Sequence, residues 1–258
     1  MNRIDVRFNK LKEENKKALI PFVTFGTGMT KKETIELVVD LDKNGATVVE
    51  IGVPFSDPLA DGPVIQNAYT KALNEGIKLK DIFEAVAEIR KESDIPVVIM
   101  VYFNIVYCRG IEKFLNQARE AGVDGLIVPD IPLEERGELN ELCVKNGIYL
   151  IPLVARTSRD RIAKIVDNAQ GFVYCVSTNG TTGERAALDD GTIEYLENVR
   201  KIVDIPMCIG FGISSKEVVS EVKDHCDGVI VGSAIVKRMA QGRDTVIDFV
   251  NDLQKGFK

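Results

Sequence analysis

The chain has 258 residues, of which 45% are hydrophobic and 28% are charged, as in a soluble globular protein with a sizeable core. This length makes a single domain covering residues 1–258 the default expectation. The formal net charge of −6 argues against a nucleic-acid partner, because that role needs a basic surface. A small anionic substrate would have to be held by local backbone dipoles or a few cations.

Short apolar runs, rich in Val and Ile, alternate with amphipathic stretches along the whole chain. Their continuous hydrophobicity predicts parallel strands that are buried on both faces. The predicted strands are Leu19–Thr24, Thr47–Ile51, Val97–Val101, Gly125–Val128, Tyr149–Leu153, Phe172–Val176, Met207–Ile209 and Gly228–Val231.

Between the strands, apolar residues recur at helical spacing. The predicted helices include Lys31–Asn44, Val64–Leu73, Lys78–Lys91, Ile111–Ala121, Leu133–Asn146, Arg159–Asn168 and Ser215–Asp224. Eight strands with intervening helices and no linker favour an α/β fold of the (β/α)₈ TIM-barrel type. An open doubly wound sheet is the alternative.

Glu50 is a carboxylate at the end of the second predicted strand, which is otherwise apolar. Burial of such a group is costly unless it has a partner or a task. Desolvation should raise its pKa towards neutrality, which suits a group that both donates and accepts a proton. The alternative is a structural carboxylate paired with a buried cation, although no Lys or Arg lies in the predicted strands.

Three more aspartates follow strand ends, and each is ambiguous. Asp61 precedes Gly62-Pro63, so from spacing alone a helix N-cap is as plausible as a catalytic group. Asp57 precedes Pro58, which is typical of a turn residue. Asp130, after the fourth strand, has the same ambiguity.

Glycine-containing turns end the sixth, seventh and eighth predicted strands. Glycine lets backbone N–H groups approach a phosphate, and a helix that starts at Ser233 would point its positive end at one. Barrel enzymes often bind phosphate at the last two strands, so we expect a phosphorylated substrate, although glycine also ends strands for steric reasons. The turns are Asn179–Gly183, Gly210–Ser214 and Gly232–Ala234.

Absent residue types narrow the chemistry. No predicted strand contains a lysine, so Schiff-base aldolase chemistry lacks its nucleophile. His225 is the only histidine and no CxxC pair occurs, which argues against a metal site and against Ser-His or Cys-His catalysis. Flavin, nicotinamide and pyridoxal have no visible anchor. Proton transfer by carboxylates on a phosphorylated substrate is what remains.

The compartment is predicted from the cysteines and the N-terminus. The cysteines are odd in number and widely spaced, as in a cytosolic protein with reduced thiols: Cys108, Cys143, Cys175, Cys208 and Cys226. The segment Met1–Arg7 lacks a signal-peptide core, and no apolar run approaches a membrane span. We therefore expect a soluble cytoplasmic enzyme or enzyme subunit.

The run Glu50–Gln66, EIGVPFSDPLADGPVIQ, resembles the signature of the tryptophan synthase α subunit family almost letter for letter. The resemblance covers essentially the whole chain. It continues through Met100–Asn104, Gly125–Asp130, Gly180–Gly183, Gly210–Ser214 and Gly228–Ser233.

This resemblance implies a lyase of tryptophan biosynthesis that cleaves indole-3-glycerol phosphate to indole and glyceraldehyde 3-phosphate. Glu50 would be the family's general acid–base group, and Asp61 would bind the indole N–H and stabilise the developing positive charge. Thr182 would orient Asp61. The phosphate-binding positions would be Gly183, Gly212, Gly232 and Ser233, and the residues that line the indole pocket or support Glu50 would be Phe22, Met100, Tyr102, Tyr174 and Phe211.

The resemblance also implies a partner. In the family, indole passes to a β subunit that holds pyridoxal phosphate, usually in an α2β2 heterotetramer, and the α subunit itself has no cofactor. The chain departs from the common family pattern in its loops, at Gly26–Gly28, Ile105, Arg156 and Thr181. These departures put loop closure and partner coupling in question more than the chemistry.

Two other functions stay open. The loop departures suggest a free-standing lyase that releases indole, and turnover with and without a β subunit separates it from the α subunit of a complex. A degenerate barrel that only activates a partner is the non-enzymatic alternative. The presence of both Glu50 and Asp61 opposes it, and a measurable cleavage rate of the solitary chain would eliminate it.

Overall fold

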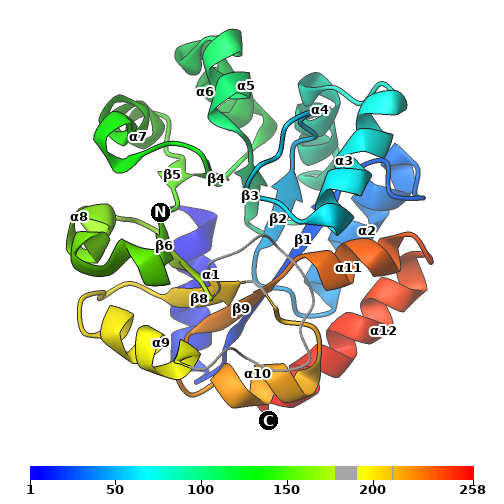
Figure 1. The fold of residues 1–258 in the computed structure, drawn as a ribbon. Coiled ribbons are helices and arrows are strands. Elements are labelled where there is room, and N and C mark those ends of the chain that lie inside the picture. The colour runs from blue at the N-terminus through cyan, green and yellow to red at the C-terminus, as the bar shows by residue number, and fades with distance from the viewer. Residues whose placement is uncertain (178–190, 211) are drawn as a thin grey trace.

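The structure is a computed structural model that describes residues 1–177, 191–210 and 212–258. Within these ranges, nine strands form one parallel sheet in the order β5-β4-β3-β2-β1-β9-β8-β7-β6, which curls into a ring with helices outside it (Figure 1). The strands are β1 (Ala18–Thr24), β2 (Val49–Gly52), β3 (Val97–Met100), β4 (Gly125–Ile127), β5 (Tyr149–Leu150), β6 (Leu153–Ala155), β7 (Val173–Val176), β8 (Met207–Gly210) and β9 (Gly228–Val231).

The predicted fifth strand, Tyr149–Leu153, is interrupted and forms the two short strands β5 and β6. Pro152 lies between them and has no N–H for the ladder. On one side the Ile151 N–H donates to the carbonyl of Leu126 (2.8 Å), and on the other the Tyr174 N–H donates to the carbonyl of Pro152 (2.9 Å). This stretch therefore links the two ends of the sheet, and the predicted barrel is confirmed.

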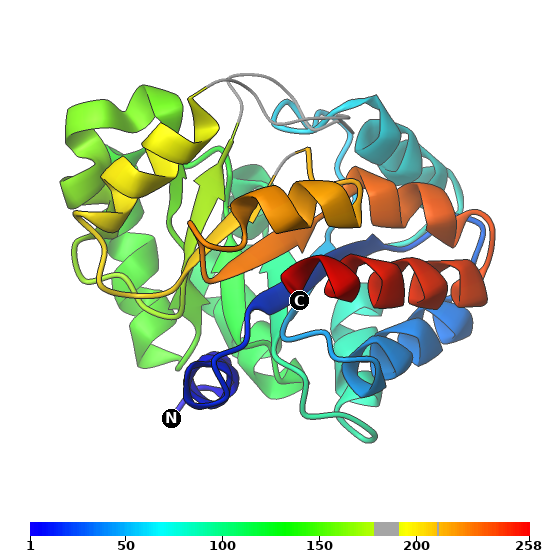
Figure 2. The same ribbon diagram turned by 90° about the horizontal axis from the view of Figure 1, so that it is seen from below.

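Helices cover the outside of the ring, and the first of them covers one end of it (Figures 1 and 2). They are α1 (Arg3–Glu13), α2 (Lys31–Lys43), α3 (Pro63–Asn74), α4 (Leu79–Ile89), α5 (Phe103–Arg109), α6 (Ile111–Ala121), α7 (Arg136–Lys145), α8 (Ile162–Val166), α9 (Thr192–Arg200), α10 (Lys216–Val222), α11 (Ser233–Met239) and α12 (Arg243–Gln254). The predicted helices Leu133–Asn146 and Arg159–Asn168 begin as 3₁₀ turns, at Leu133–Glu135 and Arg156–Arg161. The sequence did not predict α1, α5, α9 or α12.

The buried side chains form two layers, as the alternation of strand residues requires. In β1, Leu19 and Val23 point outward and pack under the helices. Ile20 and Phe22 point inward and belong to a cluster inside the barrel. Both faces of each strand are therefore buried, and an inward polar group is isolated from water.

Helix α1 closes the amino-terminal end of the barrel. Its Ile4 and Phe8 belong to the interior cluster, and the Phe8 ring lies 5.7 Å from the ring of Phe172. Figure 2 shows α1 at one end of the barrel, away from the loops at the opposite end.

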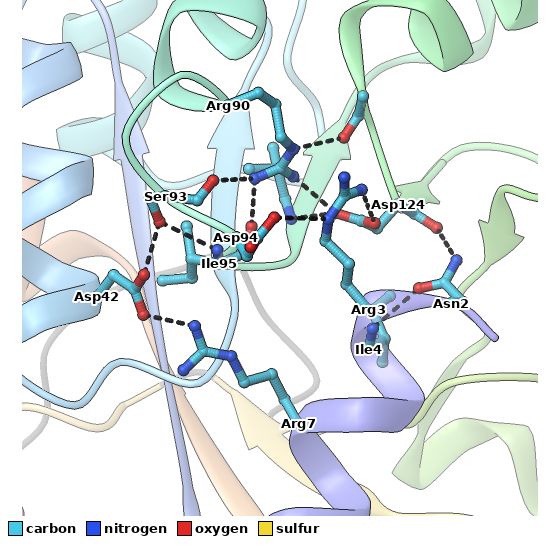
Figure 3. Close-up of polar contacts among 12 residues, drawn as sticks. Asn2, Arg3, Ile4, Arg7, Asp42, Arg90, Ser93, Asp94, Ile95 and Asp124 are labelled. Atoms are coloured by element: carbon cyan, nitrogen blue, oxygen red, sulfur yellow. Dashed lines mark hydrogen bonds and ion pairs between the residues drawn. The ribbon is translucent and has the colours of Figure 1, made fainter.

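A network of ion pairs fixes this end (Figure 3). Asp124 is buried at the start of β4, and its Oδ2 lies 2.7 Å from the Arg90 guanidinium. Its Oδ1 accepts a hydrogen bond from Arg3 of α1 (3.0 Å), and the Val97 N–H donates to its Oδ2 (2.8 Å). Nearby, Asp42 of α2 accepts hydrogen bonds from Arg7 and Ser93.

Within the described ranges, every helix is too short or too polar to cross a bilayer.

Candidate active site

A cavity of about 290 Å³ opens at the carboxyl-terminal ends of the strands. Its described walls are mostly apolar, with four polar side chains among them, Glu50, Asp61, Tyr174 and Ser233. The walls are formed by Phe22, Glu50, Ala60, Asp61, Ile65, Met100, Ile127, Pro129, Leu153, Ala155, Tyr174, Val176, Gly212, Ile213, Ile230, Gly232, Ser233 and Ala234.

Glu50 lies in the middle of β2, level with Phe22 on β1 and Val98 on β3. Its side chain points into the barrel and is only 2% exposed, and Oε2 has no hydrogen-bond partner. No cation of the described residues pairs with it, so nothing there supports the alternative of a structural ion pair. Burial, and to a lesser extent the Asp61 carboxylate, raises the pKa of Glu50 to about 8.

Asp61 lies in the loop after β2 and is 2% exposed. The Tyr102 hydroxyl donates to its Oδ2 (2.7 Å) and accepts the Ala60 N–H (3.1 Å). Phe55 stacks on the Tyr102 ring with centroids 5.0 Å apart, which holds that ring in place. Burial raises the pKa of Asp61 to about 6, and the Tyr102 hydrogen bond opposes this rise.

The helix N-cap interpretation of Asp61 is wrong. Helix α3 has Gly62 as its N-cap and Pro63 at its first position, and no side chain caps it. Asp61 instead stands one residue before the cap, with its carboxyl group turned to Tyr102 and the cavity.

The other two aspartates lie outside the cavity walls. The Ser56 hydroxyl donates to Asp57 in the turn (2.5 Å), in agreement with a turn residue. Asp130 accepts the Phe103 N–H at the start of α5 (2.8 Å), so it satisfies a helix terminus. His225 follows α10, 3.5 Å from Glu197, and does not line the cavity.

The part of the wall that follows β8 and β9 contains the predicted phosphate-binding positions Gly212, Gly232 and Ser233. The Ser233 hydroxyl is buried and has no hydrogen-bond partner. It begins α11, whose first N–H groups have no acceptor within the helix. A Cβ on Gly232 would meet nothing closer than Ile65 at 3.8 Å, so this glycine leaves open space in front of the backbone.

The other predicted site residues either line the cavity, lie behind it or fall outside the described residues. Phe22, Met100 and Tyr174 line the cavity, and Tyr102 lies behind Asp61. The remaining predicted site residues, Thr182, Gly183 and Phe211, lie outside the described residues.

Sequence reasoning missed several residues at the site. Several are apolar inward-facing strand residues, such as Ile127, Leu153 and Ile230, which the alternation within each strand could have indicated. Ile65 of α3 also lines the cavity. A second α3 residue, Tyr69, is completely buried beside the carboxylates, and only its place on the apolar face of the helix signals it.

The chemistry that this arrangement permits is limited. No Lys, Arg or His lines the described part of the cavity, and the described residues contain no cluster of His, Cys, Asp or Glu that could hold a metal. Near pH 7, Glu50 is mainly protonated and Asp61 mainly ionised, because burial and hydrogen bonding separate their pKa values. The cavity thus offers one acid and one anion in an apolar setting.

Known proteins match the chain in both sequence and fold. The family model described as tryptophan synthase alpha chain matches residues 8–257. The tryptophan synthase alpha chain of Clostridium beijerinckii is 72% identical over 258 residues, which cover 100% of both chains. The structure of tryptophan synthase subunit alpha from Legionella pneumophila has a TM-score of 0.90 at 34% identity, covering 100% of this chain and 98% of that one. A Mycobacterium tuberculosis tryptophan synthase structure has a TM-score of 0.91 at 31% identity, covering 99% of this chain and 98% of that one.

The family and its relatives span nearly the whole of this chain, so the match includes every segment that forms the cavity. In this family the α chain works without a cofactor, and pyridoxal phosphate belongs to the β subunit. The chain belongs to the tryptophan synthase alpha chain family, and it is an indole-3-glycerol-phosphate lyase of tryptophan biosynthesis.

Proposed function

We propose that Glu50 and Asp61 together carry the retro-aldol cleavage of indole-3-glycerol phosphate. The observation that carries this proposal is the pair of buried carboxyl groups whose pKa values lie on opposite sides of pH 7. Such a separation gives two like groups different roles, one as acid and one as anion. Glu50 is then ready to donate a proton, and Asp61 is ready to balance a positive charge.

The reaction proceeds in two proton transfers. Protonated Glu50 donates its proton to the indole ring carbon that bears the glycerol side chain, and the positive charge on the resulting indolenine nitrogen is balanced by Asp61. Ionised Glu50 then removes the proton of the adjacent side-chain hydroxyl. The oxygen forms a carbonyl, the carbon–carbon bond breaks, and its electrons return to the ring. Indole and glyceraldehyde 3-phosphate leave, and Glu50 is protonated again.

We assign the wall that follows β8 and β9 to the phosphate and the apolar walls to the indole ring. The unpartnered Ser233 hydroxyl and the open backbone at Gly232 support the phosphate site, together with Gly212. Phe22, Met100 and Tyr174 supply apolar surface for the ring. By family resemblance Gly183 joins the phosphate site, Phe211 the indole pocket, and Thr182 orients Asp61.

The test is the substitution Glu50→Gln, which keeps the size of the side chain and removes the titrating proton. Loss of a general acid–base group costs about 10²–10⁴-fold in rate. Indole release from indole-3-glycerol phosphate should fall by that factor, while circular dichroism stays unchanged. Release at the wild-type rate would show that Glu50 is not the acid–base group.

We further propose that the chain works with a tryptophan synthase β subunit, in an α2β2 heterotetramer. The related chain from Mycobacterium tuberculosis comes from a structure described as tryptophan synthase. Leu59 and Tyr107 are 86% and 68% exposed, and they lie in segments that follow the carboxyl-terminal ends of β2 and β3, where the cavity opens. Exposed apolar groups at that end suit a docked partner that receives indole.

The competing function is a free-standing lyase, which the departures from the family pattern at Gly26–Gly28, Ile105, Arg156 and Thr181 favour. Titration of a β subunit into the cleavage assay separates the two. Strong activation together with co-elution at the mass of a heterotetramer supports the complex. High solitary turnover that the β subunit does not change supports the free-standing enzyme.

Two simpler proposals complete this function. We propose that residues 1–258 form one domain, because β1 pairs with β9 and so joins the two ends of the chain in one sheet. A single cooperative unfolding transition tests it.

We also propose a cytoplasmic location, which the free cysteines support and cell fractionation tests.

A further inference from the structure

Tyr69 is a completely buried tyrosine that the proposed mechanism does not use. It lies on the inner face of α3, and its side chain is 0% exposed. It belongs to the cluster inside the barrel, with Phe22, Tyr102 and Tyr174, although it does not line the cavity itself. Tyr69 therefore stands directly behind the site.

The Tyr69 hydroxyl has no hydrogen-bond partner. Two other tyrosine hydroxyls are bonded, that of Tyr195 to the Val154 carbonyl (2.8 Å) and that of Tyr149 to Asp5 (2.5 Å). An unpaired buried hydroxyl destabilises a fold, and phenylalanine would fill the same space without that cost. A feature that costs stability calls for a functional reason.

The hydroxyl lies against β2 at Gly52, two residues along the strand from Glu50. A Cβ built on Gly52 would come within 2.4 Å of the Tyr69 oxygen, so Gly52 leaves the space that this oxygen fills. Gly52 follows Glu50 by two residues, so both positions face the barrel interior, about 6.6 Å apart along the strand. One Glu50 oxygen, Oε2, is also buried without a partner. The Tyr69 hydroxyl, a donor, and the Glu50 Oε2 atom, an acceptor, are thus both buried in the barrel interior without a partner.

Burial and the neighbouring ionisable groups keep Tyr69 protonated. Burial raises its pKa well above the usual value, and the neighbouring Asp61, Tyr102 and Glu50 add to this effect. The hydroxyl is therefore a hydrogen-bond donor at neutral and mildly alkaline pH.

We propose that Tyr69 is a positioning residue for Glu50, whose hydroxyl donates a hydrogen bond to the Glu50 carboxylate when that group is ionised. This inference rests on the proposed acid–base role of Glu50. Protonated Glu50 is neutral and needs no such donor. After Glu50 gives its proton to the indole ring, the buried carboxylate has no described cation beside it, and a charge-assisted bond from Tyr69 stabilises it and holds it for the second transfer.

The substitution Tyr69→Phe removes only this hydroxyl. Because a hydrogen bond to the charged form lowers a carboxyl pKa, its loss should raise the pKa of Glu50. The alkaline limb of the pH profile should move upward by about one unit, and kcat should fall about tenfold, with KM within about twofold. Thermal stability should be equal to or higher than that of the wild type, since an unpaired hydroxyl is gone.

The matched control is Tyr149→Phe, which removes a bonded hydroxyl at the opposite end of the barrel. It should lower the unfolding temperature and leave kcat and the pH profile unchanged. Replacement of Tyr69 by 3-fluorotyrosine, a stronger donor, should move the alkaline limb in the other direction from Tyr69→Phe.

Indole release by the full chain, with and without a saturating β subunit, is measured from pH 5.5 to 9.5 for the wild type, Tyr69→Phe, Tyr149→Phe and Glu50→Gln. An unchanged kcat and an unmoved limb in Tyr69→Phe, with Glu50→Gln inactive, overturn the role of Tyr69 and leave the proposed function intact. A lower kcat with an unmoved limb and a lower unfolding temperature also overturns it, since that pattern is structural. Wild-type activity of Glu50→Gln overturns both.

Discussion

The two ends of the barrel treat buried carboxyl groups in opposite ways. At the amino-terminal end, Asp124 is buried but lies between Arg90 and Arg3 and accepts the Val97 N–H (Figure 3). At the carboxyl-terminal end, Glu50 is equally buried and has no described cation and an unbonded oxygen. The side chains are chemically alike, but the surroundings of Asp124 suit a structural role, whereas those of Glu50 suit the proposed acid–base role.

The two carboxyl groups differ in whether neighbouring groups offset the free-energy cost of burying their charge. Burial raises the pKa of Asp124, but Arg90, the Val97 N–H and Arg3 all oppose that rise. For Glu50, the next contribution after burial is the Asp61 carboxylate, which raises the pKa further. A buried carboxyl group that is paired with cations stabilises the contact between elements. One without a cation keeps its proton near neutral pH and can donate it to a substrate.

The largest expected effect concerns the structural end. Asp124→Ala leaves the Arg90 guanidinium buried without its carboxylate, and loss of one partner of a buried pair costs about 3–5 kcal/mol. Urea denaturation should show this loss in the free energy of unfolding. The turnover of the folded fraction should keep its wild-type pH profile, and a shifted profile would break the separation between the two ends.

Glu50→Gln should change stability in a pH-dependent way. The folded-state pKa of about 8 lies above the ordinary glutamate value of 4.5, so the folded state holds the proton more tightly. The contribution is fully present below pH 4.5 and is lost as the pH rises through 8. The variant should therefore gain stability over the wild type from pH 5 to 9, by a few kcal/mol at about 1.4 kcal/mol per pKa unit. Chemical denaturation across that range measures it, and parallel curves would contradict an uncompensated Glu50.

Asp61→Asn tests the second carboxyl group. The wild-type kcat/KM should follow a bell between pKa values of about 6 and about 8, since Asp61 must be ionised and Glu50 protonated. The variant should lose about 10²–10³-fold, mainly in kcat, because charge stabilisation acts in the transition state. Its acid limb should vanish. An unchanged kcat with a raised KM would make Asp61 a uniform binding residue.

The smallest expected effect concerns the phosphate wall. Ser233→Ala removes a hydroxyl that has no protein partner, so stability should hardly change. Loss of one hydrogen bond to the substrate should raise KM about threefold to tenfold with little change in kcat. Steady-state kinetics with indole-3-glycerol phosphate measures this, and an unaltered KM would remove Ser233 from the phosphate site.

Local sequence patterns predicted much of the fold. The predicted strands other than the fifth end within two residues of the observed ones, because parallel strands buried on both faces must be continuously apolar. The fifth strand was wrong in detail, since Pro152 interrupts the ladder while the chain continues around the ring. Glu50 was identifiable as a polar residue in an apolar strand. Asp61 was not separable from a helix cap until Gly62 was found in that position.

The sequence by itself determined the barrel, its order of elements and one carboxylate inside it, because hydrophobic periodicity and residue type are local properties. Only the tertiary structure decided which buried carboxyl groups are compensated. Arg90 reaches Asp124 from 34 residues away, and the Tyr102 hydroxyl reaches Asp61 from 41 residues away. Desolvation and charge pairing depend on neighbours that folding brings together, so the pKa of Glu50, its isolation and the unpaired hydroxyl of Tyr69 follow from packing.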